Sequence, residues 1–185
     1  MIPALYGLAE ELEQTSQNEL LSIVSYSTRT NFNWYDRNRR VRRYSNPVSA
    51  VEYQPSYNYQ AAVQGFDNKY KYNQPVSGGT NISAGIDEGV GVLLGNRSRH
   101  NAFKTMIVMT DGQYNSGRHP SIAASDAADQ GIEVFTVTFG SGADQNTMIQ
   151  TAENGNGKHF HAPNGDALEE IFREIANIPP AAYIE

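Results

Sequence analysis

The chain has 185 residues, the size of one domain that can bury a hydrophobic core of its own. Apolar residues make up 39% and charged residues 18%, the balance of a globular protein with somewhat few charges. The absence of cysteine excludes disulfides, thiolate metal sites and a cysteine nucleophile. The net charge of −6 gives no reason to expect nucleic-acid binding. The sequence has no apolar run long enough to span a bilayer and no signal-peptide pattern after Met1, so we expect any targeting signal to lie outside it.

The beginning of the chain predicts a helix followed by a strand. Residues 4–15 place Leu5, Leu8 and Leu12 on one face and glutamates on the other, which is typical of an amphipathic helix. Residues 20–26 (LLSIVSY) predict a short, mostly buried strand. No strand precedes the helix, although a sheet built from alternating strands and helices normally opens with a strand.

Residues 29–75 differ in composition from the rest of the chain. They hold few aliphatic residues, many Asn and Gln, and seven of the eleven tyrosines. Because apolar and polar residues alternate only in patches, we expect an enlarged hairpin or loop with one or two strands, one of them around residues 48–53. Surface insertions cost little closure entropy, so we expect an insertion that the core can lose. Its tyrosines could form a recognition surface or pack within the hairpin.

From residue 76 onward, helices alternate with buried strands. Either Thr80 or Asn81 can cap a helix, and residues 105–110 (TMIVMT) and 132–139 (IEVFTVTF) are apolar runs typical of parallel strands covered on both faces. Further elements are expected as helices over residues 120–131, near 144–153 and from 166 to 179, and as a short strand over 158–162. This order predicts an α/β fold of three layers, with a doubly wound, mostly parallel sheet.

Two residues stand where such a sheet would bind a ligand, beyond the carboxyl ends of its strands. Asp111 ends the 105–110 strand and precedes Gly112, which lets the backbone turn sharply. Thr80 follows two glycines and precedes a helix, so its hydroxyl could reach a cation. Both residues also have structural alternatives, since Asp111 could cap its loop and Thr80 its helix.

Together these motifs resemble the von Willebrand factor A (vWA) family, which has a GGT-type loop and a strand end of the form V-x-x-x-T-D-G. The similar segments are residues 78–82 (GGTNI), 106–112 (MIVMTDG), 132–140 (IEVFTVTFG) and 164–168 (NGDAL). The resemblance covers roughly residues 4–28 and 76–178. It implies one Rossmann-like domain over residues 1–185, with residues 29–75 inserted in it.

The resemblance also implies a divalent-cation site, the metal-ion-dependent adhesion site (MIDAS). Its ligands in the family are a D-x-S-x-S loop after the first strand, a threonine and an aspartate, and Thr80 and Asp111 match the last two. No D-x-S-x-S segment occurs in the chain, so we expect a domain that lacks its first strand and acidic loop at the N-terminus. One carboxylate and one hydroxyl make a weak site for Mg²⁺ or Mn²⁺. We therefore expect this chain alone to bind either metal weakly or not at all.

The missing strand has a structural consequence, because the family's first strand lies in the middle of the sheet. Its two neighbours must then close up, stay apart, or borrow a strand through strand exchange or an oligomer. Unpaired buried backbone groups cost about 1–3 kcal/mol each. We therefore do not expect an empty position to persist.

The function implied by the resemblance is a non-enzymatic protein-binding or adhesion module, whose cation accepts a carboxylate from a partner protein. One alternative is a metal-free structural domain. Another is a receiver-like phospho-acceptor that uses Asp111, which would need further acidic residues and a lysine that are not evident. Residues 110–115 (TDGQYN) and 164–172 (NGDALEEIF) look most like bacterial domains of TadG-like pilus-assembly proteins. Those proteins are anchored in the membrane, which implies a cell-envelope location, although no membrane segment lies within this chain.

Three further features have simpler explanations. His159 and His161 alternate on one strand face as metal ligands would, but no third ligand lies nearby in the sequence. The arginines of residues 37–43 favour a solvated loop over an anion-binding patch. The glycines of residues 89–95 fall inside a helix and lack the G-x-G-x-x-G spacing of a nucleotide loop. If the chain did bind a metal tightly, Asp87 would be a carboxylate that could complete the site.

Overall fold

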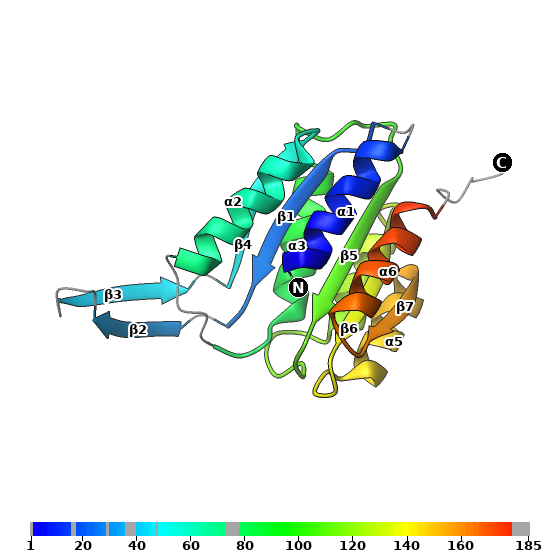
Figure 1. Cartoon of the computed structure of the whole chain (residues 1–185). Coiled ribbons are helices and arrows are strands. Elements are labelled where there is room, and N and C mark those ends of the chain that lie inside the picture. The colour runs from blue at the N-terminus through cyan, green and yellow to red at the C-terminus, as the bar shows by residue number, and fades with distance from the viewer. Residues whose placement is uncertain are drawn as a thin grey trace.

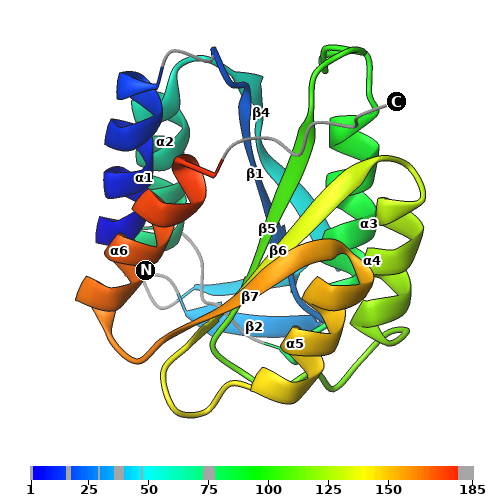
Figure 2. The same ribbon diagram turned by 90° about the vertical axis from the view of Figure 1, so that its right-hand side faces the viewer.

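The computed structural model has three layers, with helices on both faces of a central sheet (Figures 1 and 2). It describes residues 2–15, 18–28, 30–35, 40–46, 48–72 and 78–178. The elements are α1 (Ile2–Gln14), β1 (Leu21–Tyr26), β2 (Thr30–Tyr35), β3 (Val41–Asn46), β4 (Ser49–Ser56), α2 (Tyr59–Tyr72), α3 (Ile82–Leu93), β5 (Lys104–Thr110), α4 (Pro120–Ala128), β6 (Ile132–Phe139), α5 (Gln145–Asn154), β7 (Asn156–Ala162) and α6 (Gly165–Ala176). The predicted α/β fold is confirmed, and every helix and strand predicted outside residues 29–75 begins within two residues of its expected start.

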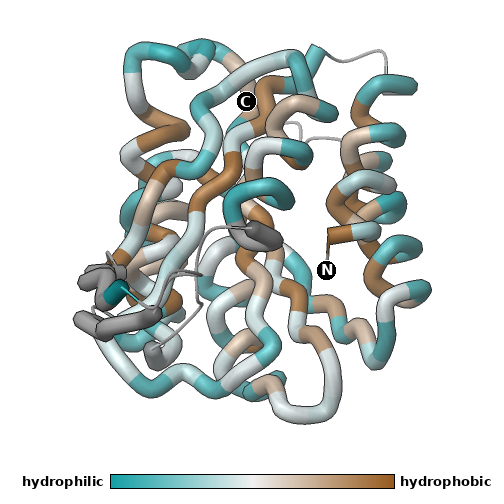
Figure 3. Tube along the Cα trace, turned by 60° about the vertical axis from the view of Figure 1, so that its left-hand side comes forward, coloured by the Kyte–Doolittle hydropathy of each residue, from teal (hydrophilic) through white to brown (hydrophobic). Residues whose placement is uncertain are grey.

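The core forms on the two faces of β6, the most deeply buried strand. Alternate residues of β6 point to opposite faces, so Ile132 and Val134 pack against α3, α4 and α5, while Phe135 and Val137 pack against α1 and α6. The apolar stretches of the chain gather along the strands and on parts of the helices (Figure 3). None of the described helices is both long and apolar enough to cross a membrane.

The sheet consists of two parts that share no ladder among the described residues. Strands β5, β6 and β7 are parallel, in that order, and β1 pairs with β4 in antiparallel fashion. The two parts meet where β1 and β5 run side by side (Figure 1). We call the gap between these two strands the open strand position. β1 is only partly buried along its whole length, and in β5 only Val108 and Thr110 are buried. Residues 20–26 were predicted to form a mostly buried strand and residues 105–110 a strand covered on both faces. Both strands are less buried than predicted, because each has an edge facing the open strand position.

Two helices cover the open strand position from opposite sides. α1 packs mainly against α2 and α6 and lies in front of the space between β1 and β5 (Figure 1). On the other face, α3 contacts β1, β4 and β5, so it bridges both parts of the sheet. The two strands are also tied at both ends, by a hydrogen bond from the Arg99 guanidinium to the Asn18 carbonyl (2.6 Å) and by one from the Tyr26 hydroxyl to the Met109 carbonyl (2.5 Å). The two strands are thus joined at their ends without a ladder between them in the described residues, contrary to the expectation that an empty position would not persist.

The segment expected to be an insertion, residues 29–75, divides into two structural parts. It contains three strands and a helix rather than one or two strands. β4 pairs with β1, and α2 buries Tyr59 and Val63 in a cluster with Ala9 of α1 and residues of β1. The main contacts of β2 and β3 are with each other, and this hairpin projects from the body of the domain (Figure 1). Only the hairpin therefore has the structure of a surface elaboration.

Replacing residues 30–46 with a short Gly/Ser linker should leave the fold intact, because the main contacts of β2 and β3 are with each other. We expect the melting temperature to change by less than about 3 °C, the shift that roughly 1 kcal/mol produces in a domain of this size. Val63→Ala, at a residue only 1% exposed, is the contrasting variant and should cost about 2 kcal/mol. Thermal unfolding followed by circular dichroism checks both values. Loss of the cooperative transition in the linker variant would show that the hairpin is part of the core.

Candidate functional site at the carboxyl edge of the sheet

The structure brings the two predicted ligands, Thr80 and Asp111, to the same edge of the sheet. Thr80 lies in the loop before α3, and Asp111 directly follows β5. A Cβ added to Gly112 would lie 3.4 Å from the Thr80 hydroxyl oxygen, so that hydroxyl sits against the turn that Asp111 begins. The Asp111 side chain is exposed, and no hydrogen bond or ion pair joins it to another described residue. Both residues therefore lie at the carboxyl end of β5, where Asp111 is exposed and Thr80 is partly buried.

Hydrogen bonds from both parts of the sheet fix the Thr80 loop. On the β1 side, the Gly79 amide donates to the Thr28 hydroxyl (2.6 Å), and the Thr28 amide donates to the Gly79 carbonyl (3.0 Å). On the β5 side, the Thr80 amide donates to the Asn115 side-chain oxygen (2.8 Å), and the Asn115 amide donates to the Thr80 carbonyl (3.2 Å). The loop thus spans the open strand position at its carboxyl end. Sequence reasoning missed Thr28 and Asn115, which lie in turns without a periodic signal.

The helix cap that Thr80 could have formed, and the loop cap that Asp111 could have formed, are formed by other residues. Asn81 caps α3, because its side-chain oxygen accepts hydrogen bonds from the Ala84 amide (3.2 Å) and the Ser83 hydroxyl (2.9 Å). Thr110 closes the turn after β5 by accepting a hydrogen bond from the Gly112 amide (3.2 Å). The side chains of Thr80 and Asp111 are therefore not used as caps.

Tyr26 is a further residue of this edge that sequence reasoning did not identify. It ends β1, its ring packs under α3 at Gly85, and its hydroxyl donates to the Met109 carbonyl of β5. Burial raises the pKa of Tyr26 to about 12, and the negative charge of Asp111 adds to the rise. The hydroxyl therefore stays protonated as a donor throughout the neutral range.

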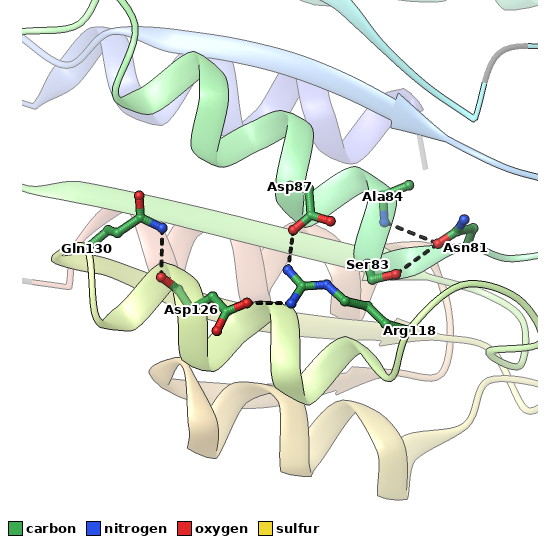
Figure 4. A network of polar contacts seen from close by, with 7 residues as sticks. All are labelled: Asn81, Ser83, Ala84, Asp87, Arg118, Asp126 and Gln130. Atoms are coloured by element: carbon green, nitrogen blue, oxygen red, sulfur yellow. Dashed lines mark hydrogen bonds and ion pairs between the residues drawn. The ribbon is translucent and has the colours of Figure 1, made fainter.

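The oxygen ligands described at this edge are too few for tight binding of a divalent cation such as Mg²⁺. In the described part of the chain, no group of three or more His, Asp or Glu side chains is arranged to hold a metal ion. Asp87 does not complete a metal site with Asp111. Its carboxylate forms an ion pair with Arg118, which also pairs with Asp126 (Figure 4). What remains is one carboxylate and one hydroxyl, and Mg²⁺ prefers octahedral oxygen coordination with one or two carboxylates.

The two histidines of β7 form a structural network with threonines of β6. His159 contacts the hydroxyls of Thr136 (2.9 Å) and Thr138 (3.3 Å), and Thr138 also contacts His161 (3.0 Å). Burial lowers the pKa of His159, and the neighbouring His161 adds to the lowering. Among the described residues, no third ligand joins this pair. The network therefore links β6 to β7.

The lysines whose side chains are described all lie away from Asp111. Lys69 pairs with Glu52, and Lys158 pairs with Glu174. Lys104 begins β5, at the opposite edge of the sheet, where it donates to backbone carbonyls. A receiver-like phospho-acceptor site needs a lysine near its aspartate, and none of these three can supply it.

Tyr26→Phe should remove the bond to the Met109 carbonyl and destabilise the fold by about 1 kcal/mol near neutral pH. The pH dependence identifies the cause. Because the folded pKa is raised to about 12, the contribution of Tyr26 is fully present below pH 10 and is lost as the pH rises towards 12. Urea unfolding of both proteins between pH 8 and pH 11 should give a difference that shrinks above pH 10. A difference that is absent, or constant with pH, would contradict this role.

Comparisons with known proteins agree with this fold. A comparison with curated protein sequences found no match. Among solved structures, proximal thread matrix protein 1 (PTMP1) from the mussel byssus aligns with 95% of this chain at a TM-score of 0.66 and 16% identity, and the chain spans only 40% of its length. BatB from Bacteroides thetaiotaomicron aligns with 94% of this chain at a TM-score of 0.66 and 15% identity, over 85% of its own length. A von Willebrand factor type A structure from Catenulispora acidiphila has a TM-score of 0.64 at 15% identity, covering 95% of this chain and 37% of its own.

One of the PTMP1 structures, at 16% identity and a TM-score of 0.65, is described as having a zinc-occupied MIDAS motif. These identities show a shared fold and no more. The family assignment comes from the sequence itself, since the model of the von Willebrand factor type A domain matches residues 1–174. The chain therefore belongs to the von Willebrand factor A family, whose domains typically mediate protein–protein interaction and adhesion.

Proposed function

We propose that this domain is a non-enzymatic protein-binding module that binds its partner at the edge carrying Thr80 and Asp111. The observation that carries the proposal is the arrangement of these two side chains. The backbone of the Thr80 loop is held by four hydrogen bonds, yet neither the partly buried Thr80 hydroxyl nor the exposed Asp111 carboxylate has a hydrogen-bond partner among the described residues. A rigid edge with two unengaged oxygen ligands suits recognition more than it suits structural support.

Metal dependence is the finer part of the proposal. The zinc-occupied MIDAS motif of PTMP1 supports metal binding within this fold. In this chain Thr80 and Asp111 would supply two ligands, and acidic ligands beyond the described residues would have to supply the rest. A cation held in this way would keep a coordination position for the carboxylate of a partner protein. The resemblance of residues 110–115 and 164–172 to TadG-like domains supports a role for this binding in pilus assembly or cell-surface attachment.

The surroundings of Asp111 support a binding role over a catalytic one. The lysines with described side chains lie elsewhere, and no described residue donates a hydrogen bond that would orient the Asp111 carboxylate as a nucleophile. A metal-free structural domain is the second candidate. The observation that favours it is the lack of a group of three potential metal ligands in the described residues.

Isothermal titration with Mn²⁺ distinguishes these functions. We expect weak or no binding by the 185-residue chain, because one carboxylate provides a single charge and few coordination positions. A fusion that carries a strand ending in D-x-S-x-S ahead of Met1 should gain binding. Asp111→Ala should abolish that gain, whereas Glu153→Gln, an exposed residue of α5, should leave it unchanged.

Two outcomes would contradict the proposal. Micromolar binding by the chain alone would mean that other groups complete the site. A fusion that folds without gaining Mn²⁺ affinity would favour the metal-free structural domain.

A further inference from the structure

We propose that the edge of the sheet at which β1 and β5 begin carries a second binding surface, which docks on an anionic lipid bilayer. This surface, the amino-edge patch, consists of Tyr57, Leu94, Arg97, Arg99, His100 and Phe103. It lies at the top of Figure 1, at the end of the sheet opposite to Thr80 and Asp111. The proposal goes beyond the protein-binding function proposed above and does not depend on a metal.

Apolar side chains gather at this edge. Among the described residues five large hydrophobic side chains are exposed, and three of them belong to the patch: Tyr57 (56%), Leu94 (42%) and Phe103 (58%). Leu94 follows α3 and Phe103 precedes β5, so they stand at the two ends of one loop. Tyr57 follows Ser56, which pairs with Leu21 at the start of β1. Single exposed apolar residues are ordinary, but several at one edge mark an interaction surface.

Basic side chains accompany the apolar ones. Residues 89–110 include three basic residues and no acidic one, in a chain whose net charge is −6. Arg97 is exposed and forms no hydrogen bond or ion pair with another described residue. The exposed Arg99 guanidinium donates to the Asn18 carbonyl (2.6 Å), which leaves other N–H donors of its planar fork for a ligand. Guanidinium groups of this kind suit the oxygens of a phosphate.

The loop between α3 and β5 is fixed before any partner arrives. The Lys104 ammonium group donates to three backbone carbonyls of the loop, those of Arg99 (3.4 Å), His100 (3.2 Å) and Ala102 (3.1 Å). A loop that is ordered in advance presents Phe103 and its neighbours with little further loss of entropy on binding. The patch is therefore ready to bind as it stands.

The shape of the patch favours a bilayer over a folded protein. Its apolar side chains are exposed at an edge, and the hollow beside α3 is lined by other residues, among them Ser49 and Glu88. A protein partner would place its own anchor residues in a pocket. Protruding aromatic and aliphatic side chains instead insert among lipid headgroups, where neighbouring arginines meet the phosphates. An anionic bilayer accordingly fits both the apolar and the basic side chains of the patch.

Co-sedimentation of the whole 185-residue chain with lipid vesicles tests the proposal. The probe is a vesicle of equal parts phosphatidylcholine and phosphatidylglycerol, and the control is a vesicle of phosphatidylcholine alone, both in EDTA. Binding to the control should be more than about tenfold weaker, because each basic residue near an anionic surface is worth a factor of about five. Binding to the probe should also weaken between about 0.1 M and about 1 M salt, as the Debye length falls from about 10 Å to about 3 Å.

Paired variants locate the contact. Phe103→Ser should weaken binding to the anionic vesicles about tenfold, whereas Ile122→Ser, at a residue of α4 that is 53% exposed, should not. Arg97→Gln should weaken binding about fivefold. Arg118→Gln removes the same charge at the opposite edge of the sheet and should bind as the natural chain does. Circular dichroism checks that each variant keeps the fold.

Tryptophan fluorescence shows whether the patch enters the bilayer. Phe103→Trp in a Trp34→Phe background places the chain's single tryptophan in the patch. Its emission should shift to shorter wavelengths with the anionic vesicles and stay unchanged with phosphatidylcholine alone, because the ring moves from water into the interface.

The proposal would be overturned by any of four results. Absence of binding to the anionic vesicles, or equal binding to both kinds of vesicle, would exclude an anionic bilayer as the partner. Equal losses in Phe103→Ser and Ile122→Ser would place the contact elsewhere, as would an unshifted emission. Binding of soluble polyglutamate in place of vesicles would make an acidic protein segment the occupant. Since the Mn²⁺ titration probes the opposite edge, failure here leaves the proposed protein-binding function untouched.

Discussion

The fold depends on how its two sheet parts are held together without a ladder between β1 and β5. Helix α3 does most of this, because it contacts β1, β4 and β5 at once. It comes close enough only because Gly85 and Gly89 leave room for the Tyr26 ring and the Met106 side chain. The Tyr26 hydroxyl of β1 adds a hydrogen bond to the Met109 carbonyl of β5. The open strand position is thus covered on both faces, by α1 and by α3.

The candidate binding edge is linked to the same feature. The loop that carries Thr80 is fastened to Thr28 after β1 and to Asn115 after β5, so it crosses the carboxyl end of the open strand position. The negative charge of Asp111 contributes to the raised pKa of Tyr26.

Much of the fold could be predicted from sequence, because its signals are local. β6 is a continuous apolar run, and α6 buries Leu168 and Phe172 at helical spacing. Thr80 and Asp111 could be singled out because a Gly-Gly-Thr loop before a helix marks the first and a strand-end motif marks the second. α2 was missed because the apolar spacing of Tyr59 and Val63 lies within a polar stretch, although both are buried. The role of Tyr26 depends on a distant strand and helix, so no local pattern could reveal it.

The most direct test of this account is the separation of β1 and β5 in solution. Nuclear Overhauser spectroscopy of the isotope-labelled chain should show contacts from the Tyr26 ring to Gly85 and to the Met109 backbone. It should show no backbone contacts between β1 and β5, because strands separated by the width of a third strand are about 10 Å apart. Sequential backbone contacts along the two strands, of the kind that neighbouring parallel strands give, would show that the sheet closes up and would contradict the account.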